Sequence, residues 1–212
     1  QRGLAAIADL KLSELSTWRR ERLSDASLLY RSEAIADLVK RALSSPADAV
    51  AQDRVRDLLR QLLHAYRYSQ ATLYDTQGRV RIAAHDEAPD PVEAEMAKRV
   101  LESGAVSMGD FYRQGPQDEP RLSVATPVLD RPGRGAPLGA VVLRIDPAAH
   151  LYPLVTRWPV PSRTAETLLV REEKGHAVLL GPLRSRADAA LRLRVPLTRS
   201  LDPAVMAVKG RE

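Results

Sequence analysis

The chain has 212 residues and a mass of 23.4 kDa, with 44% apolar and 28% charged residues. This composition is typical of a globular protein and excludes a disordered or fibrous chain. Cysteine is absent, which excludes disulfide bonds, thiolate zinc sites and cysteine nucleophiles. The net charge is +5, and the basic residues are 27 Arg and only 5 Lys, a bias that we attribute to GC-rich coding rather than to a nucleic-acid surface.

The sequence contains no segment that would anchor it in a membrane. No charge-free stretch approaches the ~20 residues needed to span a bilayer, and no secretory signal peptide is recognisable. The chain begins at Gln1 without an initiator methionine. We therefore expect it to be a piece of a longer protein.

Residues 1–68 are predicted to be helical. From Leu4 to Ser45 there is neither Gly nor Pro, and apolar residues recur at helical spacing. This pattern predicts one very long helix or two nearly continuous ones, with a reach of about 60 Å at 1.5 Å per residue. The sequence Ser45-Pro46-Ala47-Asp48 then offers Ser45 as an N-cap and a proline at the first helical position, which predicts a further helix up to Tyr66.

Residues 69–157 have the pattern of a compact α+β unit. Two β-prone runs, 71–75 and 79–84, flank the type I turn sequence Asp75-Thr76-Gln77-Gly78. Asp90-Pro91 predicts the start of a helix that ends at Gly104. Runs 106–112, 121–129 and 138–145 follow, and the Gly- and Pro-rich residues 130–137 predict a hairpin loop between the last two. Five strands with one inserted helix indicate an antiparallel sheet.

Residues 158–212 are predicted to form a second, smaller β-rich lobe. A short helical connection starts at Asp146-Pro147, and Trp158-Pro159-Val160-Pro161 predicts a rigid linker. The runs 167–171, 177–180 and 191–195 predict strands, with a helical turn at 186–190. The predicted organisation is therefore helices in 1–68, a first lobe in 69–157 and a second lobe in 158–212.

This order of elements resembles the Cache, or PDC, extracytoplasmic sensor domains of bacterial membrane receptors, in which a PAS-like five-stranded sheet follows a long N-terminal helix. The segment from Trp158 to Val170 resembles the region that joins two lobes in histidine kinases with tandem Cache architecture. The second lobe is expected to be truncated, to lack pieces, or to be smaller than in the family pattern. The segments that carry the resemblance are Trp18-Arg19-Arg20-Glu21-Arg22, Asp25-Ala26, Leu73-Tyr74-Asp75-Thr76-Gln77-Gly78, Ser123-Val124-Ala125-Thr126-Pro127-Val128, Gly139-Ala140-Val141-Val142-Leu143, Ala177-Val178-Leu179-Leu180 and Leu193-Arg194-Val195-Pro196-Leu197.

The resemblance implies an extracytoplasmic, periplasmic domain of an inner-membrane sensor histidine kinase, placed between transmembrane helices outside this chain. An unknown small molecule would bind on one face of the sheet and shift the long helix. The apolar stripe from Leu4 to Leu15 is available for a homodimer through that helix. The chain would hold no cofactor, since ATP would be used by kinase modules outside it. Chemoreceptors and diguanylate cyclases carry the same input domain and remain alternatives.

Two groups of polar residues are candidates for the site. Trp18, Arg22 and Asp25 are expected to fasten the long helix to the sheet, with a sensing surface as the alternative. In the hairpin, strand alternation puts Arg79, Arg81 and Ala83 on one face and Val80, Ile82 and Ala84 on the other. Ligand contacts are expected from the polar sides of the hairpin and of the third and fourth strands, with a solvated rim as the alternative; the candidates are Tyr74, Arg81, Asp110, Tyr112, Arg113, Arg121 and Ser123.

The remaining chemistry-bearing residues predict neither an enzyme nor a metal site. The four histidines, His64, His85, His150 and His176, are dispersed and lack metal-ligand spacing. None of the usual hydrolase, metalloprotease, Walker or dinucleotide motifs occurs. The pI of about 9.7 leaves a nucleic-acid-binding protein as a different class of alternative, but acidic residues interrupt the basic clusters and there is a single Phe for base stacking. We therefore expect no nucleic-acid partner.

Overall fold

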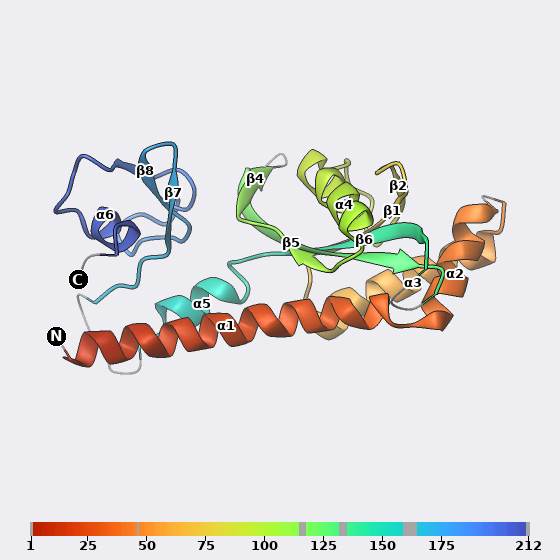
Figure 1. The fold of residues 1–212 in the computed structure, drawn as a ribbon, viewed down its shortest axis with the longest axis horizontal. Coiled ribbons are helices and arrows are strands. Elements are labelled where there is room, and N and C mark those ends of the chain that lie inside the picture. Colours follow the sequence, from red (N-terminus) through yellow and green to blue (C-terminus); the bar gives the residue numbers. More distant parts are fainter. Residues whose placement is uncertain (1, 46, 115–117, 132–134, 159–164, 211–212) are drawn as a thin grey trace. The chain divides into compact units, whose positions relative to one another are not determined.

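A computed structural model describes residues 2–45, 47–114, 118–131, 135–158 and 165–210 (Figure 1). The chain divides into two compact units. The sheet unit comprises Thr17–Asp110 and Arg121–Asp146, and the terminal unit comprises Gln1–Ser16, Phe111–Pro120 and Pro147–Glu212. This division differs from the boundaries set from the sequence, because residues 17–68 belong with the sheet while residues 111–120 and 147–157 belong with the C-terminal part.

Three helices precede the sheet: α1 (Arg2–Tyr30), α2 (Glu33–Ser44) and α3 (Ala49–Tyr66). The predicted long helical stretch is therefore two nearly continuous helices, separated where the Ser32 side chain accepts a hydrogen bond from the Ile35 N–H and caps α2. The predicted cap of the next helix at Ser45 is wrong. Asp48 caps α3 instead, because its carboxylate accepts the Ala51 N–H at 3.0 Å. Pro46 lies outside the described residues.

The central sheet contains β1 (Gln70–Asp75), β2 (Val80–Ala83), β3 (Ser107–Met108), β5 (Glu119–Leu129) and β6 (Pro137–Ile145) in the order β2-β1-β6-β5-β3, and β4 (Tyr112–Gln114) also pairs with β5. The pairings β1–β2, β1–β6, β3–β5 and β5–β6 are antiparallel. The predicted antiparallel sheet is thus confirmed, with one more strand than expected. The single strand predicted at 106–112 is wrong, because the chain leaves the β3 ladder after the Gly109 N–H bonds to the Ser123 carbonyl.

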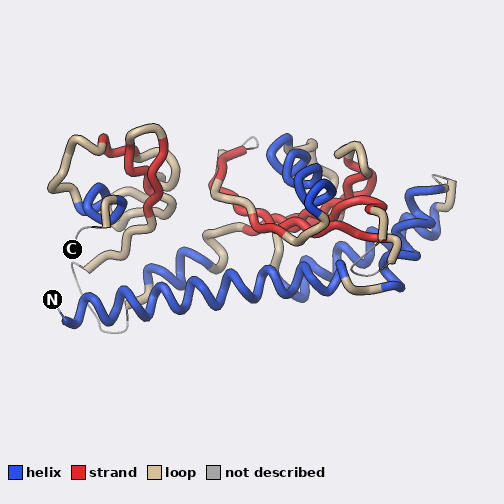
Figure 2. Tube along the Cα trace, viewed as in Figure 1, coloured by secondary structure: helices blue, strands red, loops and turns tan. Residues whose placement is uncertain are grey.

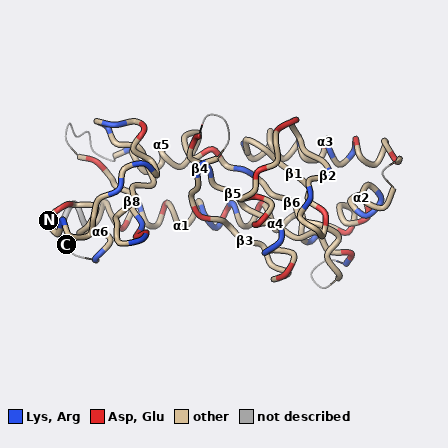
Figure 3. Tube along the Cα trace, turned by 90° about the horizontal axis from the view of Figure 1, so that it is seen from above, with Lys and Arg blue, Asp and Glu red and all other residues tan. Residues whose placement is uncertain are grey.

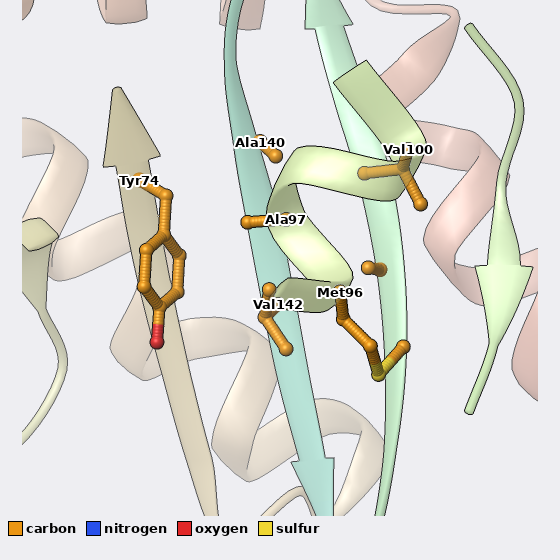
Figure 4. Close-up of a cluster of buried hydrophobic side chains, with 7 residues drawn as sticks. Tyr74, Met96, Ala97, Val100, Ala140 and Val142 are labelled. Atoms are coloured by element: carbon orange, nitrogen blue, oxygen red, sulfur yellow. The ribbon is translucent and has the colours of Figure 1, made fainter. Parts of the chain in front are cut away.

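Helices cover both faces of this sheet (Figures 1 and 2). One face packs against α4 (Pro91–Ser103), and the other packs against α2 and α3. As predicted, α4 begins at an Asp90 cap followed by Pro91 and ends at Gly104, whose φ of 64° is left-handed. Figure 4 shows the apolar core between α4 and the sheet, which consists of Tyr74, Met96, Ala97, Val100, Ala125, Ala140 and Val142.

The β1–β2 hairpin contains a bulge that changes which side chains share a face. Leu73 pairs with Ile82, but the next residue, Tyr74, pairs with Val80, so Arg81 is the extra residue. The strict alternation expected from the sequence is therefore wrong here. Val80 packs against the core beneath α4, whereas Arg81 is exposed and pairs with Asp75 at 3.6 Å.

The hairpin turn depends on the buried carboxylate of Asp75. Its Oδ1 accepts the Gln77 and Arg79 N–H groups at 2.9 and 3.0 Å, and its Oδ2 pairs with the Arg79 guanidinium at 3.0 Å. Burial alone would raise the pKa of Asp75, but the hydrogen bonds from the backbone of Arg79 and Gln77 and from the Arg79 side chain outweigh it and lower the pKa below its ordinary value.

Replacing Asp75 by Asn is therefore expected to lower the free energy of unfolding by about 1 kcal/mol at pH 7, because an amide oxygen accepts the same N–H groups without the charge. The folded-state pKa lies below the unfolded value of about 3.9, so the contribution of the charge is complete above pH 3.9 and disappears as the pH falls through the folded-state pKa. Urea denaturation of both proteins at pH 7 and pH 3 measures this, and a difference that persists unchanged at pH 3 contradicts it.

The terminal unit contains α5 (Leu151–Thr156), β7 (Val170–Glu173), β8 (His176–Leu179), β9 (Arg194–Pro196) and α6 (Pro203–Val208). β7, β8 and β9 form an antiparallel sheet, and α6 packs on it over a small core of Ala177, Leu179, Ala189, Val195, Ala204 and Val205. The second β-rich segment is therefore confirmed. Its first and third strands begin three residues later than predicted. The helical turn predicted at 186–190 is wrong, because Arg186 forms a bridge with Leu183 and a turn at 187–188 follows it. Residues 159–161 of the predicted linker lie outside the described residues.

Candidate functional site

Polar side chains gather on the α4 face of the central sheet. Gln70, Thr72 and Tyr74 lie on this face because alternate residues of β1 point to the same side. The register aligns Gln70 with Arg144 of β6, and Arg144 with Ser123 of β5. All five residues are buried. A buried polar row of this kind needs partners, and α4 and the coil before it provide them.

Arg144 is the centre of the cluster, and only 6% of its side chain is exposed. It forms a two-pronged ion pair with Glu93 of α4, Nε to Oε1 at 2.6 Å and Nη2 to Oε2 at 3.0 Å. Its remaining nitrogen, Nη1, lies 2.5 Å from Oε2 of Glu87. Burial alone would lower the pKa of Arg144, but the hydrogen bonds and charges of Glu93 and then Glu87 raise it above its ordinary value. Arg144 is therefore permanently charged.

A second ion pair and two hydroxyl groups complete the cluster. Arg121 pairs with Asp90 at 3.2 Å, and the Ser123 hydroxyl donates to Glu93 at 3.3 Å. Burial, and then the charge of Glu93, raises the pKa of Tyr74, so its hydroxyl stays protonated. The cluster thus sets three carboxylates, those of Glu87, Asp90 and Glu93, against two guanidinium groups, and carries one excess negative charge.

The space around these groups is almost filled. The residual cavity, bounded by β1, β2, Arg144 and the coil that leads into α4, measures about 10 Å³, which is room for no more than one water molecule. Glu87 differs from the other charged members because 43% of its side chain is exposed, against 2% for Asp90 and for Glu93. Glu87 is therefore the member of the cluster that can leave with the smallest rearrangement.

The structure brings three of the seven predicted ligand contacts together. Tyr74, Arg121 and Ser123 surround the Arg144–Glu93 pair. Arg81 is exposed outside this cluster, and Asp110, also exposed, is the last residue of the first segment of the sheet unit.

Tyr112 and Arg113 belong to the terminal unit, where Arg113 donates to the Ala190 carbonyl at 2.8 and 3.0 Å. This separation follows from the break between β3 and β4, since the prediction had placed Asp110 and Tyr112 on one strand.

Arg144, Glu93 and Glu87 were missed by the sequence interpretation. One signal was present: Arg144 interrupts the apolar run from Val141 to Ile145, and a charge in the middle of a buried strand requires a buried partner.

The predicted helix cluster lies apart from this site, at the start of β1. Arg22 pairs with Asp25 at 3.1 Å, donates to the Tyr66 carbonyl at 3.1 Å and lies 5.7 Å from the centre of the Tyr68 ring. Burial raises the pKa of Asp25, and the charge of Arg22 partly offsets this. Trp18 is half-buried one turn before Arg22. The contacts tie α1 to the segment that leads into the sheet.

Within the described residues, no group of three or more His, Asp or Glu side chains is arranged to hold a metal ion. In the same part of the chain, no helix combines the length and the apolar character needed to cross a bilayer. Figure 3 shows that basic and acidic residues are interspersed along the chain.

No family model and no curated protein matches the sequence. Solved structures do. The ligand-binding domain of the Campylobacter jejuni chemoreceptor Tlp3, in complex with 4-methylisoleucine, has a TM-score of 0.60 at 15% identity over 74% of this chain and 62% of that domain. The sensor domain of the Vibrio cholerae histidine kinase DctB has a TM-score of 0.56 at 16% identity over 70% and 56%. The Pseudomonas aeruginosa amino-acid chemoreceptor PctC, in complex with GABA, has a TM-score of 0.61 at 15% identity over 95% and 82%.

The chain shares the fold of these ligand-binding and sensor domains, which is the Cache arrangement expected from the sequence. The expected fold class, an α+β Cache arrangement with a second small sheet, is confirmed. These neighbours are ligand-binding or sensor domains rather than catalytic domains. The chain spans less than two thirds of the Tlp3 and DctB domains that it matches.

Proposed function

We propose that this Cache domain is the extracytoplasmic sensor of a membrane receptor and that it binds a small amino acid on the α4 face of the sheet. The observation that supports this most is the pairing of buried Arg144 with the half-exposed Glu87. A guanidinium group held by Glu93 on one edge presents its other edge to any carboxylate that can replace Glu87. The neighbours bound to 4-methylisoleucine and GABA support a ligand of this class.

The charge of the cluster favours an amino acid over a dicarboxylate. When Glu87 leaves, Arg144 and Arg121 balance Glu93 and Asp90, so the remaining site is neutral. A zwitterion keeps it neutral, whereas a dicarboxylate adds two negative charges to a buried site. The protonated Tyr74 hydroxyl hydrogen-bonds to Glu93 and borders the same site, so it can transfer this hydrogen bond to the ligand carboxylate.

Ligand binding in this scheme acts on the coil that precedes α4. Glu87 belongs to that coil and Glu93 to the helix, so exchanging Glu87 for a ligand changes the contacts of both. A ligand that binds the displaced arrangement more tightly shifts the population toward it. The chain itself performs no catalysis and holds no cofactor.

The output that we propose is a histidine kinase in the cytoplasm, which would use ATP in modules outside this chain; the DctB neighbour supports it. A chemoreceptor is the second candidate, supported by the Tlp3 and PctC neighbours. In both cases the domain is periplasmic, lies between transmembrane helices and pairs with a second copy through α1. Sequencing the complete gene distinguishes the two outputs.

Isothermal titration calorimetry with the twenty amino acids, GABA, succinate and malate tests the ligand class. We expect at least one amino acid, and neither dicarboxylate, to bind with a Kd below about 100 μM, as is usual for a small ligand that makes charged contacts in a buried site. Tyr74→Phe is expected to weaken this binding about ten-fold through loss of one hydrogen bond, and Arg81→Gln, a control outside the cluster, to leave it unchanged. Absence of any amino-acid binding, or an equal effect of both variants, contradicts the proposal.

A further inference from the structure

A second place for a ligand lies wholly within the terminal unit. There the beginning of α1 is joined to α5 by a buried lysine: Lys11 Nζ donates to the Leu154 carbonyl at 2.6 Å and pairs with Glu14 at 2.9 Å. Lys11 is only 5% exposed, so these contacts offset the cost of burying its charge. The Lys11–Glu14 pair is neutral overall.

A cavity of about 380 Å³ lies beside this contact, within the range of small-molecule sites. It is far larger than the residual space of about 10 Å³ at Arg144. Much of its wall is apolar and comes from Leu10, Pro153, Leu154 and the indole of Trp158. A wall of this kind favours a ligand with an apolar body.

Two hydrogen-bond donors that line the same cavity can accept a further partner. The indole Nε1–H of Trp158 is buried and has no hydrogen-bond acceptor in the described part of the chain. The guanidinium of Arg157 is exposed, and no ion pair joins it to an acidic side chain of the described residues. A buried donor without an acceptor is costly and rare in folded proteins. A ligand oxygen that carries negative charge would satisfy both groups.

We infer that this cavity binds a small monocarboxylate with an apolar tail, its carboxylate on Arg157 and the Trp158 N–H and its tail against Leu10, Pro153 and Leu154. Because the charges of Lys11 and Glu14 cancel, the charge of Arg157 makes the cavity prefer an anionic ligand. The apolar wall disfavours phosphate and dicarboxylates, which are strongly hydrated. The inference is independent of the proposed amino-acid site, since the two sites share no residue.

The two tryptophans of the chain make a direct test possible, because Trp18→Phe leaves Trp158 as the only indole. Titration of this variant with butyrate, hexanoate and octanoate is expected to give saturable changes in Trp158 fluorescence, with affinity that rises with tail length. The matching uncharged amides are expected to bind at least about ten-fold more weakly, as the loss of one charged contact requires. Adding Arg157→Gln is expected to remove the preference for carboxylate over amide. Arg199→Gln, an exposed arginine of the same unit that does not line the cavity, is expected to change nothing.

Three outcomes would overturn the inference: no saturable response to any acid, equal affinity for acids and amides, or an Arg157→Gln protein that keeps the preference. If Trp18→Phe does not fold, calorimetric titration of the unaltered chain with octanoate and octanamide decides the same question. Tyr74→Phe, which acts at the sheet site, is expected to leave octanoate binding intact. If no amino acid binds at the sheet site, the octanoate titration still tests the cavity. If octanoate does not bind, the amino-acid titration still tests the sheet site.

Discussion

Arg144→Met is expected to lower the free energy of unfolding of the sheet unit by about 3–5 kcal/mol, the cost of leaving a buried charge without its partner. Glu93 is 1% exposed and receives both of its short contacts to a guanidinium from Arg144. Without Arg144 the Glu93 carboxylate stays buried but loses both contacts to a guanidinium, which is unfavourable. Urea denaturation followed by far-UV circular dichroism measures the loss.

A double variant separates the ion pair from the packing around it. Arg144→Met combined with Glu93→Met removes both charges and fills a similar volume, so at least half of the lost stability is expected to return. Glu102→Met is a matched control, since Glu102 is an exposed residue of the same helix and is expected to cost less than about 0.5 kcal/mol. A double variant that is as unstable as the sum of its two single variants would show that the pair is not the source of the effect.

Glu87→Ala is expected to raise the affinity for the amino acid by about ten-fold or more. If Glu87 leaves the Arg144 guanidinium free for less than about a tenth of the time, the observed affinity is at least about ten-fold weaker than that of the free guanidinium, and the variant removes this competition. The short contact of 2.5 Å to Arg144 is the reason to expect that Glu87 occupies the guanidinium most of the time in the unliganded domain. Calorimetric titration of the variant with the amino acid identified for the unaltered chain gives the ratio of the two Kd values.

Asp86→Ala is the control for a change of charge alone, since Asp86 is the exposed neighbour of Glu87 on the same coil. It is expected to change the affinity less than about three-fold, as a solvent-exposed charge is screened by salt. If Glu87→Ala weakens binding, Glu87 contacts the ligand instead of competing with it. That result would discard the displacement scheme and keep the binding function.

The features that the sequence predicted well are those set by neighbours in the chain. Asp90, Pro91 and Gly104 are enough to place α4, because capping and a left-handed terminus act within one turn. The same locality explains two errors. The bulge at Arg81 is decided by how β2 meets β1, and the exit of the chain after Gly109 is decided by a bond to Ser123. Neither the bulge nor the exit of the chain can be predicted from the alternation of polar and apolar residues within one strand.

The site was harder to predict, because its members come from distant parts of the chain. Arg144 lies 51 residues from Glu93 and 57 from Glu87, so no spacing motif joins them. The helical periodicity of residues 93–100 does indicate one member of the ion pair. Glu93 falls on the same helical stripe as Met96, Ala97 and Val100, and an acid on the buried stripe of α4 calls for a cation on the strand beneath it.

The composition of the two units sets an order for their folding during synthesis. Every residue of the sheet unit has been made once Asp146 leaves the ribosome, whereas the terminal unit needs Gln1–Ser16 together with residues from 147 onward. Lys11 illustrates the delay, because its acceptor, the Leu154 carbonyl, is made 143 residues later. Until then Lys11 has only water and Glu14, and Leu10 and Leu154 have not yet met across the cavity. Residues 1–16 are thus made before the sheet unit but acquire their native partners after it is complete, and a ligand of the α1–α5 cavity would act on that later step of folding.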